Sequence, residues 1–233
     1  MRLVTKDDFI DVYLKGVQRG FSFLISKLNP NAKSRTKSAF DNSSVQHSNW
    51  WIVPFVRERW NEKITGSKSL EYEAYTVEKH LKDRTDLKVL SIGSGICSHE
   101  LKFASFPNFS EIICTDIADN LLQKAEGYAK ERGLTNIKFW ERDVYKVEFE
   151  AEEFDLIMFN SSLHHFSDIQ TLISDKIKKW LKPDGMLMIN EYVGEDRLQF
   201  DTHQIASINE GLALIPTKLK QRFKSDLTKH KFY

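Results

Sequence analysis

The sequence has little cysteine, no long apolar run and no surplus of charge of either sign. Its two cysteines, Cys97 and Cys114, are too few for a disulfide framework, and no Cys/His spacing resembles a zinc site, so no metal centre is expected. No stretch approaches the roughly 18 apolar residues of a membrane-spanning helix. Lys and Arg number 34 against 33 Asp and Glu, so no overall field draws the chain to nucleic acid or an anionic bilayer.

Export signals are also lacking. Asp7 and Asp8 stand early in the chain, and the basic, apolar and small-residue order of a cleaved signal peptide is absent. A cytoplasmic location is the resulting expectation. What the sequence does contain is an ordinary globular composition, 41% hydrophobic and 29% charged over 233 residues, which is enough for one α/β domain with additions.

The first part of the chain predicts helices joined by a linker. Apolar residues recur at near-helical spacing from Thr5 to Leu28, and Thr5 with Asp8 predicts a capping box at the start. Residues 29–48 are rich in Asn, Ser and Lys, which is typical of a flexible linker. The tail from Lys218 to Lys231 holds six basic residues and is expected to be a solvated helix face.

Two further helices are predicted before residue 87, over Asn49–Asn61 and Ser69–Lys82. The first has a high aromatic content for a surface helix. That content either packs the helix on the main domain or makes it a lid over a ligand site. Its large apolar residues are Trp50, Trp51, Phe55, Val56 and Trp60.

From residue 87 onward, short apolar strands alternate with helices. This alternation predicts a three-layer α/β fold with a Rossmann-like parallel sheet flanked by helices, whose ligands bind beyond the carboxyl ends of the strands. Helices should start near Ser98, Ala118 and Ser167, and Pro183-Asp184-Gly185 should turn the chain into the last strand. The expected strands are Lys88–Ile92, Glu111–Thr115, Ile137–Trp140, Phe154–Asn160 and Met186–Tyr192.

Glycines follow the first of these strands. In Gly93-Ser94-Gly95 the missing side chains let the backbone turn tightly and approach a ligand, although such pairs also occur in ordinary strand-to-helix turns. Asp116 ends the second strand 23 residues after Gly93, near the offset of about 20 at which an acidic residue receives ribose hydroxyls. A nicotinamide-dependent oxidoreductase would share both features, but Ser98 replaces the third glycine of its G-x-G-x-x-G loop.

The glycine motif and the Asp116 motif are followed by three more motifs. Together the five, in this order, resemble the motifs of class I S-adenosylmethionine-dependent methyltransferases, and the resemblance covers about residues 87–195. The segments around Asn190 to Gly194 and from Trp50 to Gly66 resemble a bacterial subset, some members of which occur near glycan-assembly functions. The chain is therefore expected to have two parts: a helical N-terminal extension or lid over residues 1–86, and an S-adenosylmethionine-binding domain over residues 87–233. The motifs are Val89–Gly95, Thr115-Asp116-Ile117, Arg142-Asp143-Val144, Phe154–Asn160 and Leu181–Leu187.

The resemblance also implies how the cofactor, S-adenosyl-L-methionine, is held. The backbone of Gly93, Ser94 and Gly95 would lie against its methionine part, Asp116 with Ile117 would hold the ribose, and Asn160 would lie near the sulfonium. Asp143 and Val144 would meet the adenine; the alternative for Asp143 is a surface acid that caps a turn. The family's third loop glycine is Cys97 here, which asks for more room beside the cofactor.

Three side chains are candidates for catalysis. Methyl transfer is a direct displacement, so it needs in-line positioning and no covalent enzyme nucleophile. A hydroxyl acceptor would benefit from a base, and His164 and His165 follow Asn160 closely at the expected mouth of the site. Alternatively, one histidine caps the next helix and the other packs in the core. Glu191, after the last strand, is a second candidate base, or a buried glutamate bonded to backbone amides.

The expected acceptor is a small molecule or saccharide, methylated on oxygen. Nucleic-acid methylation is disfavoured, because Asn160 is followed by Ser161-Ser162-Leu163 and not by a Pro-Pro-aromatic run. The alternative function is a non-catalytic, methyltransferase-like module that needs a partner. It rests on the region after Tyr192, where Gln204–Leu214 and Pro216–Tyr233 read as helices, so that the family's usual C-terminal strand pair would be incomplete. The oligomeric state is not indicated.

Overall fold

The computed structural model describes residues 4–20, 53–194, 200–222 and 225–232. Its contacts divide the chain into one unit of residues 46–192 and a second made of residues 1–45 with 193–233. This division differs from the expected boundary after residue 86. The expected linker at 29–48, with Trp50 and Trp51, lies outside the described residues. Among the helices that are described, none is long and apolar enough to cross a membrane.

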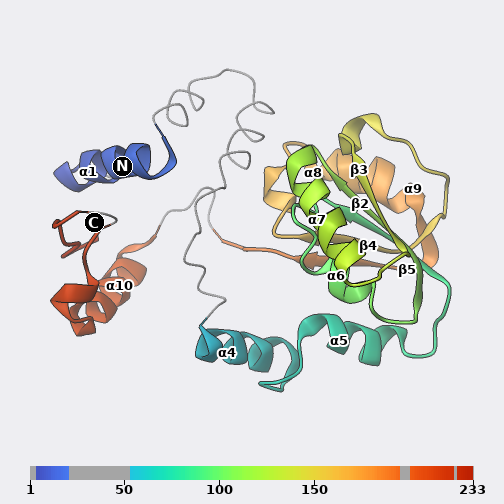
Figure 1. The fold of residues 1–233 in the computed structure, drawn as a ribbon, viewed down its shortest axis with the longest axis horizontal. Helices are drawn as coiled ribbons and strands as arrows, with labels where there is room; N and C mark the ends of the chain where they lie inside the picture. The colour runs from blue at the N-terminus through green and yellow to red at the C-terminus, as the bar shows by residue number, and fades with distance from the viewer. Residues whose placement is uncertain (1–3, 21–52, 195–199, 223–224, 233) are drawn as a thin grey trace. The chain divides into compact units, whose positions relative to one another are not determined.

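The larger unit is built on a parallel sheet of five strands in the order β3-β2-β1-β4-β5 (Figure 1). The predicted α/β Rossmann-like fold is therefore confirmed. All five predicted strands are present; one has the predicted bounds, and the other four differ at one or both ends by one to five residues. They are β1 (Leu87–Ile92), β2 (Phe109–Asp116), β3 (Ile137–Glu141), β4 (Phe154–Asn160) and β5 (Leu181–Asn190).

Alternate residues of the buried strands face two separate cores, which makes the three layers. Val89 and Leu156 join one core, while their neighbours Leu90 and Ile157 join the other, as the period of two in a strand requires. The first core is covered by α6 (Glu100–Phe103), α7 (Asp119–Glu131) and η2 (Val77–Leu81). The second is covered by the helical run of α8 (Ile169–Thr171), η5 (Leu172–Ile177) and α9 (Lys178–Trp180), with η3 (Val144–Lys146).

The last strand departs from its prediction at its beginning. Residues 183–185 were expected to form a turn before the strand, but they lie within β5. The β4–β5 register shifts there, because Phe154 pairs with Leu181 whereas Leu156 already pairs with Met186. The Pro-Asp-Gly sequence thus bulges out of a strand that begins earlier than its apolar residues indicate.

Two helices that precede residue 87 belong to the larger unit, which is why its boundary differs from the expected one after residue 86. They are α4 (Pro54–Thr65) and α5 (Tyr72–Thr76), the second continuing into η2. Gly66 ends α4 with φ +79°, a left-handed conformation that suits glycine. Asn108, just before β2, donates its amide to the carbonyls of Leu81 and Arg84 at 2.9 and 2.8 Å. Side-chain bonds to backbone of this kind tie the segment before residue 87 to the sheet.

The smaller unit contains α1 (Lys6–Arg19) and α10 (Thr202–Leu214). The capping pair at the start of α1 is confirmed: the Asp8 carboxylate accepts the backbone N–H and the hydroxyl of Thr5, both at 2.8 Å. The predicted helix over Gln204–Leu214 is also confirmed and starts at Thr202, with Asp201 as its N-cap.

The prediction of a helix over Pro216–Tyr233 is wrong. The described part of this segment holds the short helix η6 (Thr217–Leu219) and an antiparallel bridge between Gln221 and Thr228. Arg222 does not lie on a solvated helix face, because it is 2.6 Å from Asp11 and 2.9 Å from Asp7 of α1. These ion pairs hold the Arg222 side chain against α1. Among the described residues after β5, no strand joins the sheet.

A buried carboxylate holds the amino-terminal end of the sheet together. Asp155 of β4 accepts the backbone N–H of Lys88 at 2.9 Å and lies 2.8 Å from both Arg84 and Lys182. Asp155→Ala would leave these donors without their acceptor. We expect it to lower the free energy of unfolding by about 3–5 kcal/mol in urea denaturation.

Asp184→Ala is the matched control, because Asp184 meets the same guanidinium at 3.3 Å while its own side chain is 77% exposed. An exposed ion pair contributes about 0.2–1 kcal/mol. Equal effects of the two substitutions would contradict the role assigned to Asp155.

Candidate functional site

The loop after β1 has the backbone geometry that its glycines predict. Gly93 and Gly95 have φ of +72° and +54°. A Cβ on Gly93 would lie 2.7 Å from the Cβ of Ser162, so close packing requires glycine there. Gly95 has no atom within 4 Å of the corresponding position, so its outer side is open to a ligand. Ser94 donates its backbone N–H to the carbonyl of Thr115 at 3.1 Å, which holds the loop against the end of β2.

Asp116 lies beside this loop and fastens it. Its Oδ2 accepts the N–H of Gly95 and its Oδ1 accepts that of Ala118, both at 2.8 Å. Each carboxylate oxygen has a further lone pair, so both can still accept a hydroxyl proton. Ile117 follows directly and is half-buried. The open glycine backbone and the adjacent carboxylate fit the methionine and ribose parts of S-adenosylmethionine.

Cys97 does not crowd the site in the way its size predicts. Its side chain is fully buried in the first core, and the Cys97 Sγ lies 3.7 Å from the carbonyl of Gly95. The cost of replacing glycine appears in the backbone instead, because φ of Cys97 is +56°, where a side chain is disfavoured by about 1 kcal/mol. The expectation of lost room beside the cofactor is therefore corrected.

Asp143 and Val144 follow β3 at the same edge of the sheet. Asp143 is half-buried and caps η3, its carboxylate accepting the N–H of Tyr145 at 3.2 Å, while Val144 is buried. The preceding residue, Arg142, donates its N–H to the carbonyl of Asp116 at 3.0 Å, which joins the ends of β2 and β3. The capping role is thus present, and a contact of Asp143 with adenine stays a prediction.

Asn160, at the end of β4, belongs to a polar chain that the sequence did not reveal. Its Nδ2 donates to the hydroxyl of Tyr72 at 2.5 Å, and its Oδ1 accepts from Asn190 at 2.9 Å. Burial raises the pKa of Tyr72 well above its ordinary value, so the phenol stays protonated. Tyr72 lies 88 positions away from Asn160 on α5, and no local motif marks it. Asn190 begins a segment that the resemblance included, but nothing singled it out.

Tyr72→Phe would remove the acceptor of the Asn160 amide in a half-buried place. Leaving such a donor unsatisfied costs about 1–3 kcal/mol, and we expect urea denaturation to show a loss of that size. Tyr75→Phe on the same helix is the control, since the hydroxyl of Tyr75 accepts from the exposed Lys79. A Tyr72 variant as stable as the Tyr75 variant would show that the polar chain contributes nothing to the fold.

The three candidate catalytic residues lie together. Glu191 is nearly buried, with 7% of its side chain exposed, and its Oε1 accepts the N–H of Leu163 at 2.6 Å. Its Oε2 lies 2.9 Å from Nδ1 of His164, whose ring centre is 4.0 Å from that of His165. Partial burial and the neighbouring His164 lower the pKa of His165, so this histidine is neutral at pH 7. Neither histidine packs in the core, and Glu191 bonds both an imidazole and a backbone amide.

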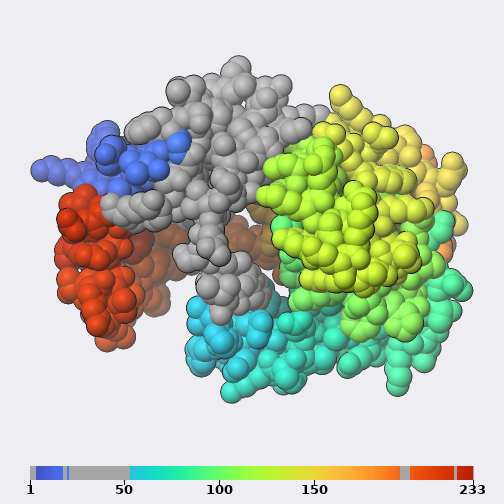
Figure 2. All heavy atoms as spheres, viewed as in Figure 1, coloured from blue at the N-terminus to red at the C-terminus, as the bar shows by residue number. Residues whose placement is uncertain are grey.

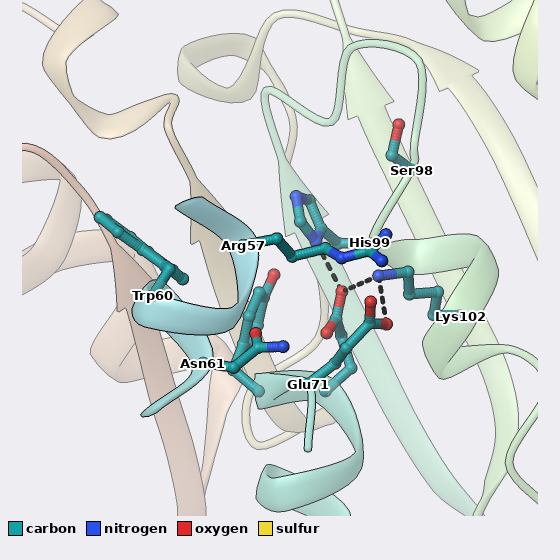
Figure 3. Close-up of a pocket in the computed structure, with 9 residues that line it drawn as sticks. Arg57, Trp60, Asn61, Glu71, Ser98, His99 and Lys102 are labelled. Atoms are coloured by element: carbon teal, nitrogen blue, oxygen red, sulfur yellow. Dashed lines mark hydrogen bonds and ion pairs between the residues drawn. The ribbon is translucent and has the colours of Figure 1, made fainter. Parts of the chain in front are cut away.

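A pocket of about 380 Å³ lies beside the segment that follows the glycine loop (Figure 3). It is lined by side chains of α4, the start of α5 and the segment after the loop, among them Arg57, Trp60 and Lys102. Tyr72 also lines it, so the pocket adjoins the chain to Asn160. In Figure 2, α4, which carries Arg57, stands at the surface of this unit.

Comparisons with known proteins agree with this arrangement. The model of a family described as "Methyltransferase domain" matches residues 83–232. Among curated relatives, an uncharacterized methyltransferase, YcgJ, of Bacillus subtilis is 31% identical over 48% of this chain and 44% of its own length. A phosphoethanolamine N-methyltransferase of Plasmodium falciparum is 30% identical over 76% and 63%. A sterol 24-C-methyltransferase of Debaryomyces hansenii is 27% identical over 75% and 48%. The chain therefore spans less than two thirds of these relatives.

Proposed function

Since the chain belongs to the class I S-adenosylmethionine-dependent methyltransferases, enzymes with S-adenosylmethionine as cofactor, we propose that it methylates a hydroxyl group of a small molecule or saccharide. The observation that carries this proposal is the pair of His164 and Glu191 at the carboxyl ends of β4 and β5. Two of the relatives named above methylate nitrogen and carbon according to their names, so the oxygen acceptor rests on this pair.

The cofactor supplies a methyl group activated by its sulfonium. In this proposal, the backbone of Gly93 to Gly95 receives the methionine part, Asp116 with Ile117 the ribose, and Asp143 with Val144 the adenine. Asn160 lies at the end of the next strand, where its amide is fixed from both sides by Tyr72 and Asn190. A side chain held in this way orients its neighbours with little loss of entropy on binding.

The proposed base is His164. The Glu191 carboxylate accepts at Nδ1, which favours the tautomer with its proton there and leaves the lone pair on Nε2. That nitrogen can take the proton of an acceptor hydroxyl while Glu191 stabilises the imidazolium that forms. His165, neutral at pH 7, is the second candidate for the same step.

Calorimetric titration with S-adenosylmethionine and S-adenosylhomocysteine tests the cofactor site without an acceptor. A panel of hydroxylated sugars and small hydroxylated metabolites, run beside a panel of amines, then tests the acceptor. We expect methyl transfer to oxygen. Transfer to the amines alone would overturn the O-methyl proposal and leave the family assignment untouched.

A further inference from the structure

We propose that the pocket beside the glycine loop is an acceptor subsite for an anionic group, a phosphate or a carboxylate, with Arg57 as its principal ligand. The inference rests on the proposed function in one respect, namely that the anion belongs to the methyl acceptor. The pocket volume of about 380 Å³ lies in the range of about 300–1,000 Å³ of small-molecule sites.

The acidic side chains of the pocket are already neutralised. Glu73, 2% exposed, lies 2.7 Å from Nδ1 of His99 and 3.1 Å from Lys102, and Glu71 lies 2.7 Å from the same lysine (Figure 3). Burial opposes ionisation of Glu73, but the hydrogen bond from His99 and the charge of Lys102 outweigh it and hold the pKa of Glu73 below its ordinary value. Both carboxylates are therefore poor receptors for a cationic ligand, which would also face the Lys102 ammonium.

Arg57 is the remaining charge of the pocket. It lines the pocket from the exposed side of α4, and none of the ion pairs found between described residues includes it. Figure 3 shows its side chain reaching across the pocket towards His99 and Lys102. A guanidinium with free N–H groups binds phosphate or carboxylate in a bidentate manner. Arg57 thus lines the pocket with no carboxylate of the described residues paired to it, beside Glu71 and Glu73, which already have cationic partners.

The rest of the lining suits the uncharged part of such an acceptor. Trp60 and Tyr72 give aromatic surface, and the exposed Ser98 offers a hydroxyl. Tyr72 connects this pocket to Asn160, the residue expected near the sulfonium. An acceptor held by its anionic end at Arg57 would therefore direct its other end towards the place where the methyl group is expected.

The experiment uses the full chain saturated with S-adenosylhomocysteine. Inorganic phosphate and acetate are titrated separately, and binding is measured from the NMR shifts of the backbone amides of residues 98–102. Arg57→Gln is compared with Arg59→Gln, a residue of the same helix that pairs with Glu62 at 2.6 Å and does not line the pocket. We expect Arg57→Gln to weaken binding of the better anion about tenfold or more, and Arg59→Gln to leave it within about twofold. Thermal melts of both variants test whether each is folded.

The affinity for S-adenosylhomocysteine is measured by calorimetry in the same variants. It distinguishes an anionic group of the acceptor from the carboxylate of the cofactor as the group that binds in the pocket. An unchanged cofactor affinity in Arg57→Gln supports an acceptor subsite. If that affinity falls as much as the anion affinity, the pocket receives the carboxylate of the cofactor itself and the proposal is overturned. Absence of anion binding to the wild type also overturns it. Failure of S-adenosylhomocysteine to bind would count against the proposed cofactor site, while the anion titration on the free protein would still decide this inference.

Discussion

Asp116→Ala is expected to weaken binding of S-adenosylhomocysteine by at least about 100-fold, because two hydrogen bonds to a charged group, at about 1.5–3 kcal/mol each, would be lost. The prediction follows from the place of this carboxylate between the glycine loop and α7, where each oxygen keeps a lone pair beyond its backbone contact. Titration calorimetry measures the effect directly.

Loss of the two backbone contacts of Asp116 would also loosen the loop, so the binding result needs a reference. Asp119→Ala is suitable, since Asp119 lies three positions further along the chain and accepts from Gln123 of its own helix, at 2.6 Å. We expect this variant to bind like the wild type. Unchanged affinity in a folded Asp116 variant would show that the ribose is held elsewhere.

The second large effect is expected on turnover. His164→Ala should lower kcat for the best hydroxyl acceptor of the panel by about 10²–10⁴-fold, the usual contribution of a general base. Glu191→Gln should lower kcat less, since the imidazole remains but its tautomer is no longer fixed by a charged acceptor.

His165→Gln distinguishes the two histidines. The imidazole bonded to Glu191 is that of His164, whose ring centre lies 4.0 Å from that of His165. We therefore expect kcat to fall by less than about threefold in His165→Gln, a small effect beside that of a positioned base. A collapse of activity in this variant, with His164→Ala active, would transfer the role of base to His165.

The sheet could be predicted because its signal is local. Continuous apolar segments such as Phe154–Asn160 are what a strand buried on both faces requires, and this strand has the predicted bounds. The backbone at Gly93 and Gly95 was equally predictable, since positive φ after a strand favours glycine. Where the apolar pattern was interrupted, as at Pro183, the prediction placed a turn and the chain instead bulges within β5.

The parts that could not be predicted depend on distant contacts. Tyr72 reaches Asn160 across 88 positions, and Arg222 reaches Asp11 across 211. Neither partner is marked by spacing or composition. The basic tail shows the same limit, because its charge pattern suits a helix as well as the ion pairs that hold it. Cys97 was misjudged for a related reason: the sequence gives the size of a side chain but not the side of the loop on which it lies.

The contact between Asp116 and Gly95 preorganises the glycine loop that we propose as the receptor of the cofactor. Fixing the backbone of one residue costs about 1–2 kcal/mol of conformational entropy. In this chain the cost is met when the protein folds, because the carboxylate holds the Gly95 amide at 2.8 Å through contacts internal to the protein. Association then has to order mainly the ligand. The loop would bind as a rigid template, and its amide hydrogens would exchange slowly with solvent both before and after the ligand arrives.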